Sequence, residues 1–166
     1  MKQKIPPEEY YKNLPRKRVA SGMIFFDETG SKVFLVKPSY KEHWLFPGGV
    51  VEADESPKAG AIREVKEEIG IDVNPSSLLV VDYVPASSVN GVMVHDALIF
   101  LFYGGRMSEE MKSRIVLDNE EIVDSCFFTL EEAASLLNVN SRRRLEYVIE
   151  AIEKGITVYI EKECKA

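Results

Sequence analysis

Three glutamates between residues 57 and 69 have a spacing that could support metal chemistry. Glu64, Glu67 and Glu68 stand at i, i+3 and i+4, so on a helix their carboxylates lie on one face. Two carboxylates about 5 Å apart at an effective dielectric near 20 repel by roughly 3 kcal/mol, which favours a bound cation. Oxygen ligands without a nearby His or Cys predict Mg²⁺ or Mn²⁺ rather than zinc. A solvated acidic helix face is the alternative for three glutamates taken alone.

Signals at both ends of this stretch predict a helix over residues 57–69. Ser56 is a good N-cap, Pro57 suits the first helical position, and Gly70 suits the left-handed position after a helix. At about 100° per residue, the apolar side chains fall on a stripe roughly opposite the glutamates. These apolar residues are Ile62, Val65 and Ile69. We therefore expect one face of the helix to pack and the other to present three carboxylates.

The segment containing this helix resembles the box of the Nudix hydrolase family, G-x5-E-x7-R-E-U-x-E-E-x-G-U, in which U is aliphatic. Every fixed position is matched, by Gly49, Glu55, Arg63, Glu64, Val65, Glu67, Glu68, Gly70 and Ile71. So many specified positions make a chance match negligible. The resemblance implies a MutT-type, Mg²⁺-dependent pyrophosphohydrolase that cleaves a diphosphate bond in a nucleoside diphosphate linked to another group, X.

The resemblance also implies which residues hold the metal and which do chemistry. Glu64, Glu67 and Glu68 correspond to the metal-binding carboxylates, and the carbonyl of Gly48 is a plausible backbone ligand. Bound Mg²⁺ would neutralise the anionic pyrophosphate and lower the pKa of an attacking water. Glu64 or Glu121 would accept the proton of that water.

The other box residues are expected to support the site. Arg63 is a candidate catalytic residue. We expect its guanidinium to pair with Glu55 or Glu64 and so to fix the loop against the helix. Gly49, Glu55 and Gly70 are expected to be structural. A glycine at position 49 lets the backbone approach a metal or phosphate that a Cβ would crowd.

Outside the box, family members often supply another carboxylate from a later loop, and the acidic segment 118–124 resembles that place. Glu121 is the first choice and Glu120 the second, whereas an acidic loop that only solvates the sheet edge is the alternative. Arg18 and Tyr40 are the candidates for contact with the substrate. No spacing decides among these residues.

The order of elements predicts an α+β fold, which in this family is an α/β/α sandwich with a mixed β-sheet and flanking helices. Strands are expected at residues 18–26, 33–37, 78–84, 92–103, 122–128 and 156–160. Helices are expected at 6–14, 57–69, 130–138 and 142–154, the third behind the capping box Thr129-x-x-Glu132. We expect one domain over 1–166, with an N-terminal extension (1–17) and a C-terminal helix and short strand (141–166).

The composition of the chain limits the cellular compartments and the binding partners that we expect. A net charge of −6 makes a nucleic acid polymer a poor partner, because the charge repels a polyphosphate backbone. The longest apolar run is too short to span a membrane, and the first residues lack a signal-peptide core. Cys126 lies in an apolar run and is expected to be a buried reduced thiol. We expect a cytoplasmic protein whose partner is a small-molecule nucleotide, and a homodimer is left open.

The substrate is less well defined than the reaction. A nucleoside triphosphate, oxidised ones included, is the first choice because no extra substrate domain is visible. ADP-ribose or a nucleotide sugar is the second. A non-catalytic nucleotide-sensing Nudix module and an enzyme similar to isoprenoid diphosphate isomerase are the alternatives. Three adjacent arginines, Arg142–Arg144, are expected to form the solvated start of a helix.

Overall fold

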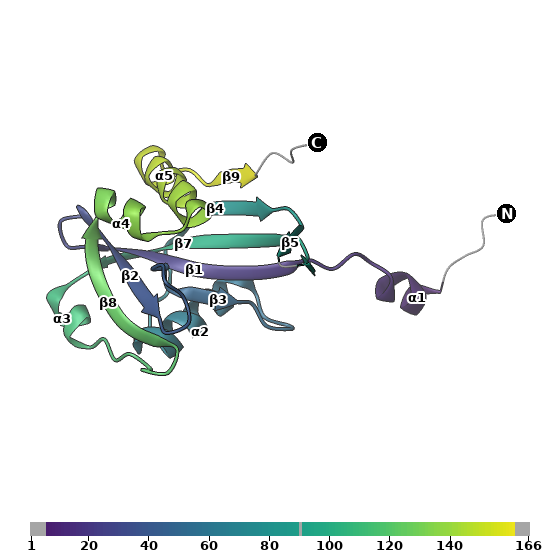
Figure 1. Ribbon diagram of the computed structural model, residues 1–166, viewed down its shortest axis with the longest axis horizontal. Coiled ribbons are helices and arrows are strands. Elements are labelled where there is room, and N and C mark those ends of the chain that lie inside the picture. The colour runs from purple at the N-terminus through teal and green to yellow at the C-terminus, as the bar shows by residue number, and fades with distance from the viewer. Residues whose placement is uncertain (1–5, 90, 162–166) are drawn as a thin grey trace.

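A mixed β-sheet forms the central layer of the protein, and helices cover both of its faces (Figure 1). The computed structural model describes residues 6–89 and 91–161. The strands run in the order β8-β2-β1-β7-β4-β9, and β3 pairs with β1 beside this path. The strands are β1 (Arg18–Asp27), β2 (Lys32–Pro38), β3 (Gly48–Val50), β4 (Ser77–Val84), β7 (Ala97–Met107), β8 (Ile122–Thr129) and β9 (Val158–Glu161). The predicted α+β class is confirmed.

The sheet is mixed because its middle strands pair in both senses. β1 is parallel to β7 and antiparallel to β2 and β3. β4 is antiparallel to β7 and parallel to β9, while β8 pairs antiparallel with β2 at the opposite edge. The remaining elements are α1 (Pro7–Lys12), α2 (Pro57–Ile69), α3 (Glu109–Ser113), α4 (Leu130–Leu136), α5 (Val139–Lys154), and the hairpin of β5 (Ser87–Val89) and β6 (Val92–Val94).

Two hydrophobic clusters join the helices to the two faces of the sheet. Met23 and Phe25 of β1 pack in the cluster that contains Val65 of α2. The alternate residues of β1 point the other way, so that Ile24 packs in the cluster that contains Val148 of α5. The sandwich therefore places α2, which carries the glutamates, on one face of β1 and α5 on the other.

Local signals place α2 where the sequence predicts it. The hydroxyl of Ser56 accepts a hydrogen bond from the backbone N–H of Ala59 at 3.1 Å. Gly70 ends the helix with φ 73°, in the left-handed region that glycine adopts without strain. The capping box at Thr129 and Glu132 is also present. These predictions are confirmed.

Three predictions from the sequence are wrong. The strand expected at 92–103 is interrupted at residues 95–96, where the carboxylate of Asp96 binds Lys17 and accepts from the hydroxyl of Tyr83 at 3.2 Å. The helix expected at 142–154 begins earlier, because Asn138 caps it through the N–H groups of residues 140 and 141. Cys126 is exposed, since β8 is an edge strand with one face left uncovered.

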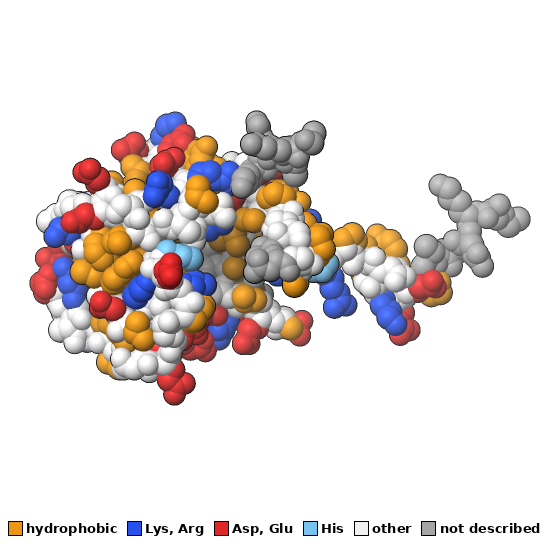
Figure 2. Space-filling model, in the orientation of Figure 1, with side chains coloured by type: hydrophobic (Ala, Val, Ile, Leu, Met, Phe, Trp, Pro, Cys, Tyr) orange, Lys and Arg blue, Asp and Glu red, His pale blue; other side chains and the backbone are white. Residues whose placement is uncertain are grey.

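The part of the chain from α1 to the start of β1 projects away from the sandwich (Figure 1). Its short helix α1 has no buried residue, and hydrophobic side chains lie along this arm in the space-filling view (Figure 2). On the body, acidic and basic side chains are interspersed over the face shown there. No helix within the described ranges is long and apolar enough to cross a bilayer.

Candidate functional site

The backbone of β3 brings the glutamates of α2 against the central strand. β3 pairs with β1 so that Gly48 lies opposite Gly22 and Gly49 opposite Ser21. A Cβ on Gly49 would lie 2.5 Å from the carboxyl carbon of Glu64. Gly48 has φ 143°, and a Cβ there would collide with the backbone of β1. Glycine at position 49 therefore lets the Glu64 carboxylate pack directly on β3, and glycine at position 48 lets β3 lie close against β1.

Glu68 lies beneath the same strand and is not part of an exposed helix face. Its side chain is 6% exposed, and Oε2 accepts a hydrogen bond from the N–H of Gly48 at 2.8 Å. Burial raises the pKa of Glu68 to about 8, and the negative charges of Glu64, Glu121 and Asp118 act in the same direction. The expectation that the glutamates share one open face is therefore wrong for Glu68, because β3 covers that part of α2.

Arg63 ties the box loop to the helix through a fork of hydrogen bonds. Its Nε and Nη2 donate to the two carboxylate oxygens of Glu55, each at 3.0 Å. Nη1 donates to Glu64 and to Glu67, each at 2.9 Å, and Nη2 also donates to the carbonyl of Val50. The guanidinium lowers the pKa of Glu55 through this fork. This geometry agrees with a positioning role for Arg63. The guanidinium also compensates part of the negative charge of the box glutamates.

Glu121 approaches the box from a different part of the chain. Its Oε1 accepts a hydrogen bond from the hydroxyl of Tyr40 at 2.7 Å, and its backbone carbonyl accepts from Ser39 N at 2.8 Å. Its charge is close enough to raise the pKa values of both Glu64 and Glu68. Glu121 therefore lies within electrostatic reach of two of the box carboxylates, and a hydrogen bond joins it to Tyr40, another candidate from outside the box.

A turn before Glu121 fixes the backbone of the acidic segment. Asp118 Oδ1 accepts hydrogen bonds from the N–H groups of residues 120, 121 and 122. The carbonyl of Glu120 is held by the hydroxyl of Ser39 at 3.0 Å. Asp118 is a positioning residue that the sequence reasoning did not single out, although an Asp two to four residues before a strand is typical of such a turn.

The possible metal-ligand atoms in this region suit a hard divalent cation. The side chains offer carboxylate oxygens, and the lack of a Cβ on Gly49 lets the Glu64 carboxylate lie directly against β3. Within residues 6–89 and 91–161, however, no three His, Cys, Asp or Glu side chains are already grouped as metal ligands. Glu64 and Glu67 are both turned to Arg63. A cation bound here would therefore compete with that guanidinium for the two carboxylates.

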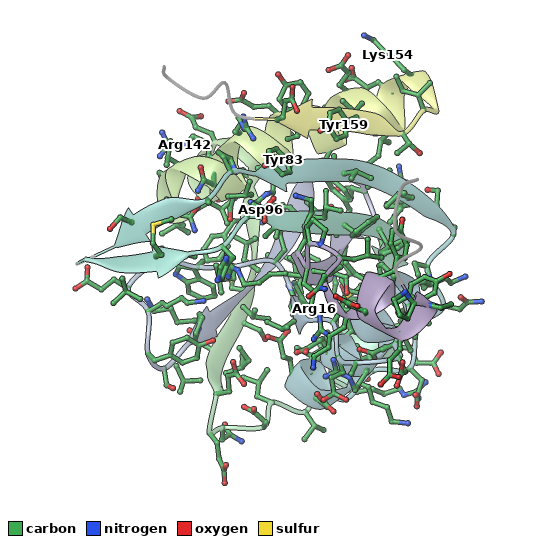
Figure 3. All side chains as sticks on the ribbon, turned by 90° about the vertical axis from the view of Figure 1, so that its right-hand side faces the viewer. Arg16, Tyr83, Asp96, Arg142, Lys154 and Tyr159 are labelled. Carbon is green, nitrogen blue, oxygen red and sulfur yellow. The ribbon has the colours of Figure 1, made fainter. Side chains whose placement is uncertain are left out.

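Arg18 lies apart from this cluster. Its Nε donates to the carbonyl of His95 at 3.2 Å, and its backbone N–H donates to that of Asp96. It lines a cavity of about 320 Å³ with Lys17 and the box loop at residues 50–57. Figure 3 shows Asp96 next to Tyr83 in this region. In the described part of the chain, no contact joins Arg18 to Glu64, Glu67 or Glu68.

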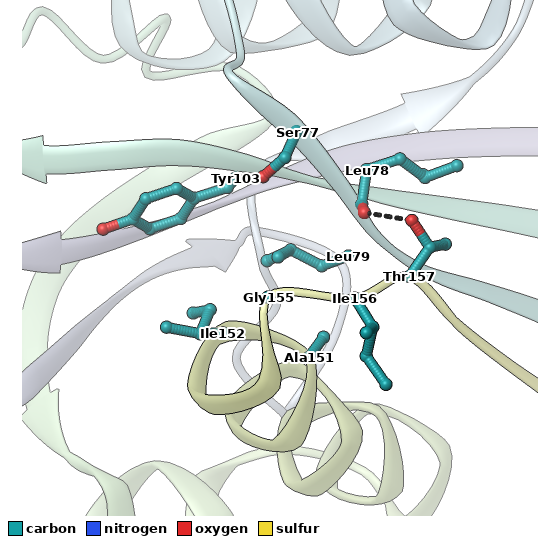
Figure 4. Close-up of a pocket in the computed structure, with 9 residues that line it drawn as sticks. All are labelled: Ser77, Leu78, Leu79, Tyr103, Ala151, Ile152, Gly155, Ile156 and Thr157. Carbon is teal, nitrogen blue, oxygen red and sulfur yellow. Dashed lines mark hydrogen bonds between the residues drawn. The ribbon is translucent and has the colours of Figure 1, made fainter.

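Two of the cavities on the face of the sheet that α5 covers differ in their charged lining. One, of about 290 Å³, lies at the end of α5 and has no charged side chain in its lining (Figure 4). The other, of about 220 Å³, is shared with the box strand: Gly48 and Gly49 line it together with Lys41 and Arg144. The second combines positive charge with both glycines of β3, so it is the better candidate for the part of a substrate that is not cleaved.

Two of the three adjacent arginines are only partly exposed and bind a buried carboxylate, contrary to the expectation from sequence. Asp82 of β4 is fully buried, and its carboxylate binds Arg143 Nη2 and Arg144 Nε, each at 2.7 Å. A buried carboxylate needs such partners because desolvation of an unpaired charge is costly. The signal in the sequence is Asp82 itself, since it occupies an inward position of an otherwise apolar strand, in step with Val80.

Comparisons with known proteins agree with this fold. A model of the NUDIX domain matches residues 16–148, and the chain belongs to the NUDIX family. It is 40% identical over 65 residues to an 8-oxo-dGTP diphosphatase of Proteus vulgaris, a match that covers 37% of this chain and 56% of the relative. It is 27% identical over 133 residues to diphosphoinositol polyphosphate phosphohydrolase 3-alpha of Mus musculus, covering 80% of this chain and 76% of that protein.

The fold is shared with a solved structure of a MutT protein from Methanosarcina mazei Go1. The TM-score is 0.67 at 22% identity, and the match covers 85% of this chain and 99% of the other. The chain thus spans nearly all of that structure but little more than half of the Proteus vulgaris relative. These likenesses establish the family and the fold, whereas the activity and substrate of this chain are matters for proposal.

The buried carboxylate of Glu68 should make the stability of the metal-free protein depend on pH. Because its pKa is about 8 in the folded state and 4.5 ordinarily, the folded state holds a proton that the unfolded chain releases. This stabilisation is complete below about pH 4.5 and is lost as the pH rises towards about 8. In chelator, urea unfolding should show a decrease on the order of a few kcal/mol between about pH 5 and pH 8.

Glu68→Gln is the matched control for this pH dependence, because the amide keeps the shape and still accepts from Gly48 N but does not titrate. Its stability should vary less over the same pH range. A wild-type profile as flat as that of the variant would contradict the burial of an ionisable Glu68.

Proposed function

We propose that this protein hydrolyses a diphosphate bond in a small nucleotide, with Mg²⁺ or Mn²⁺ as cofactor. The observation that carries the proposal is the packing of Glu64 and Glu68 of α2 against the glycine pair of β3, with Glu121, held by Tyr40, near enough for its charge to act on both. Membership of the NUDIX family, and relatives named as a diphosphatase and a phosphohydrolase, support the same reaction class.

The residues that would hold the cation are Glu64, Glu67, Glu68 and the carbonyl of Gly48. When bound, such an ion neutralises the substrate's phosphates and makes a water molecule more acidic. Arg63 keeps the box loop and the helix in register through Glu55. Displacement of Glu64 and Glu67 from Arg63 would leave the guanidinium bound to Glu55 and to the carbonyl of Val50, so the loop would stay fixed.

Glu121 is the proposed acceptor of the proton from the attacking water. Tyr40 donates to Oε1, which orients the carboxylate and leaves Oε2 to take the proton. Burial raises the pKa of Glu64 as well, so Glu64 is the second candidate for this role. No covalent intermediate is required, because positioning and charge stabilisation can supply the rate enhancement.

For the substrate, we propose a nucleoside triphosphate first, oxidised forms included, and ADP-ribose or a nucleotide sugar second. A cavity of about 220 Å³ adjoins the glycine pair and offers two cationic side chains, Lys41 and Arg144. A highly phosphorylated inositol would need more positive charge than this cavity offers, since Arg144 is already paired with Asp82.

The metal requirement gives the first test. Mg²⁺ or Mn²⁺ should raise the melting temperature and be obligatory for hydrolysis, whereas Ca²⁺ should raise the melting temperature but support turnover poorly, because the larger ion accepts looser geometry. The measurement is phosphate or nucleotide release from a nucleotide panel, with ¹⁸O-labelled water identifying the phosphorus that is attacked. Full activity in excess chelator would exclude the proposal, and binding without turnover would favour the nucleotide-sensing alternative.

A further inference from the structure

The cavity beside β3 exists because β1 carries small residues where its neighbour carries large ones. Ala20 and Gly22 of β1 lie opposite Ile99 and Leu101 of β7 in the parallel register, and all four line the cavity. Leu45, Phe46 and Leu101 contribute apolar side chains to its lining. Apolar walls suit a ring better than a compact anion.

Arg144 gives one wall of this cavity a fixed polar group. Asp82 lies beside Ile99 in the antiparallel register of β4 and β7, and therefore on the same face of the sheet. Its buried carboxylate accepts from Arg144 Nε at 2.7 Å, which sets the plane of the guanidinium. The terminal nitrogens of Arg144 make no hydrogen bond with any residue in the described ranges. They remain available as donors to whatever enters the cavity.

A guanidinium fixed in this way can recognise a ring that presents two neighbouring acceptors. Guanine offers O6 and N7 in that arrangement, and a bidentate contact to these two atoms is the commonest specific contact of arginine with a base in DNA recognition. Adenine presents a donor, N6, beside N7, so it offers Arg144 only one acceptor. Guanine oxidised at C8 carries a proton on N7 and loses that acceptor. The geometry therefore distinguishes guanine from adenine and from its own oxidised form.

We infer that the cavity binds the guanine base of the substrate, with Arg144 donating to O6 and N7 and Asp82 holding Arg144 in place. This inference rests on the proposed function, because it names the nucleotide that the site accepts. It narrows the substrate to an unoxidised guanine nucleotide. The similarity to an 8-oxo-dGTP diphosphatase does not oppose this, since that match covers 37% of the chain.

Equilibrium binding of nucleoside monophosphates tests the inference without turnover. By calorimetry in Mg²⁺, wild-type protein should bind GMP at least about tenfold more tightly than AMP, and also more tightly than 8-oxo-GMP. The ligand-side control is 7-deaza-GMP, which replaces N7 by C–H and should lose about tenfold in affinity. This comparison needs no variant, so it holds even if substitution of Arg144 prevents folding.

The protein-side test is Arg144→Lys, which keeps the charge beside Asp82 but removes the fork. In this variant the ratio of GMP to 7-deaza-GMP affinity should fall close to one, and the ratio of GMP to AMP affinity should fall about tenfold. Arg142→Lys is the matched control, because Arg142 is exposed on the same helix and does not line the cavity. It should keep both wild-type ratios.

The outcomes separate this inference from the proposed function. Hydrolysis of nucleotides with no preference for guanine, a preference for cytosine, or equal loss of GMP and AMP binding in Arg144→Lys would overturn the inference and leave the hydrolase standing. The expected binding ratios without hydrolysis of any nucleotide would support the inference and overturn the proposed reaction.

Discussion

Replacing Glu68 with glutamine is expected to lower the kcat of Mg²⁺-dependent hydrolysis by roughly 10²–10³-fold while the protein stays folded. The carboxylate is buried beneath β3, where it is costly to ionise, and a neutral amide of the same shape removes that cost. At neutral pH and in chelator, the variant should therefore be more stable than wild type although it is much less active. Activity assays and urea unfolding on the same preparations measure both effects.

Glu67→Gln is expected to lower kcat similarly but without the gain in stability. Glu67 is exposed, and its carboxylate is bound to Arg63, so folding gains nothing from its neutralisation. Glu52→Gln is the matched control for both variants, because Glu52 is an exposed acid of the box loop whose side chain has no assigned role. Near-normal turnover of Glu67→Gln and Glu68→Gln would show that the assignment of metal ligands is wrong.

The limits of α2 were predictable from sequence because the signals that set them are local. Ser56 and Gly70 act within one helical turn of the ends they define, and no distant residue is needed. The pairing of Arg63 with Glu55 and Glu64 was also predictable, since all three residues lie in the same short segment. What the sequence could not indicate is that β3 would cover Glu68, because that depends on how β3 pairs with β1.

Contacts between residues distant in sequence also explain the other differences between the predictions from sequence and the structure. Asp82 and Arg144 are 62 positions apart, and only the packing of α5 on β4 brings them together. Without that knowledge, three adjacent arginines resemble a solvated helix start. Cys126 is similar: its apolar neighbours predict burial, but the position of β8 at the edge of the sheet leaves it exposed. The cavity next to β3 depends on the same cross-strand registers and has no local signature.

The choice between Glu120 and Glu121 also depends on contacts between distant parts of the chain. Adjacent residues in a loop cannot be separated by spacing, yet their side chains point differently once the turn is fixed. Asp118 fixes the turn by accepting three backbone hydrogen bonds, and Tyr40 binds Glu121. The contact between Tyr40 and Glu121 therefore favours Glu121, which was the first choice from sequence.

Glu121→Gln is expected to lower kcat by about 10²-fold or more, as removal of a general base does. It should weaken the thermal stabilisation by Mg²⁺ much less than Glu68→Gln does, because the three acids of α2 remain. Glu120→Gln is the matched control, with the same chemical change one residue away, and should keep normal turnover. The comparison requires kcat and the Mg²⁺-dependent shift in melting temperature for all three variants.

Tyr40→Phe sharpens the assignment because it removes only the hydrogen bond to Glu121 Oε1. If that bond orients a base, kcat should fall by less than in Glu121→Gln, and the double variant should be no worse than Glu121→Gln alone, since two residues acting through one carboxylate are not additive. Additive losses would mean that Tyr40 acts on the substrate independently. Normal turnover in both Glu120→Gln and Glu121→Gln would reduce this segment to an acidic loop and transfer the role of base to Glu64, whose carboxylate already packs against Gly49.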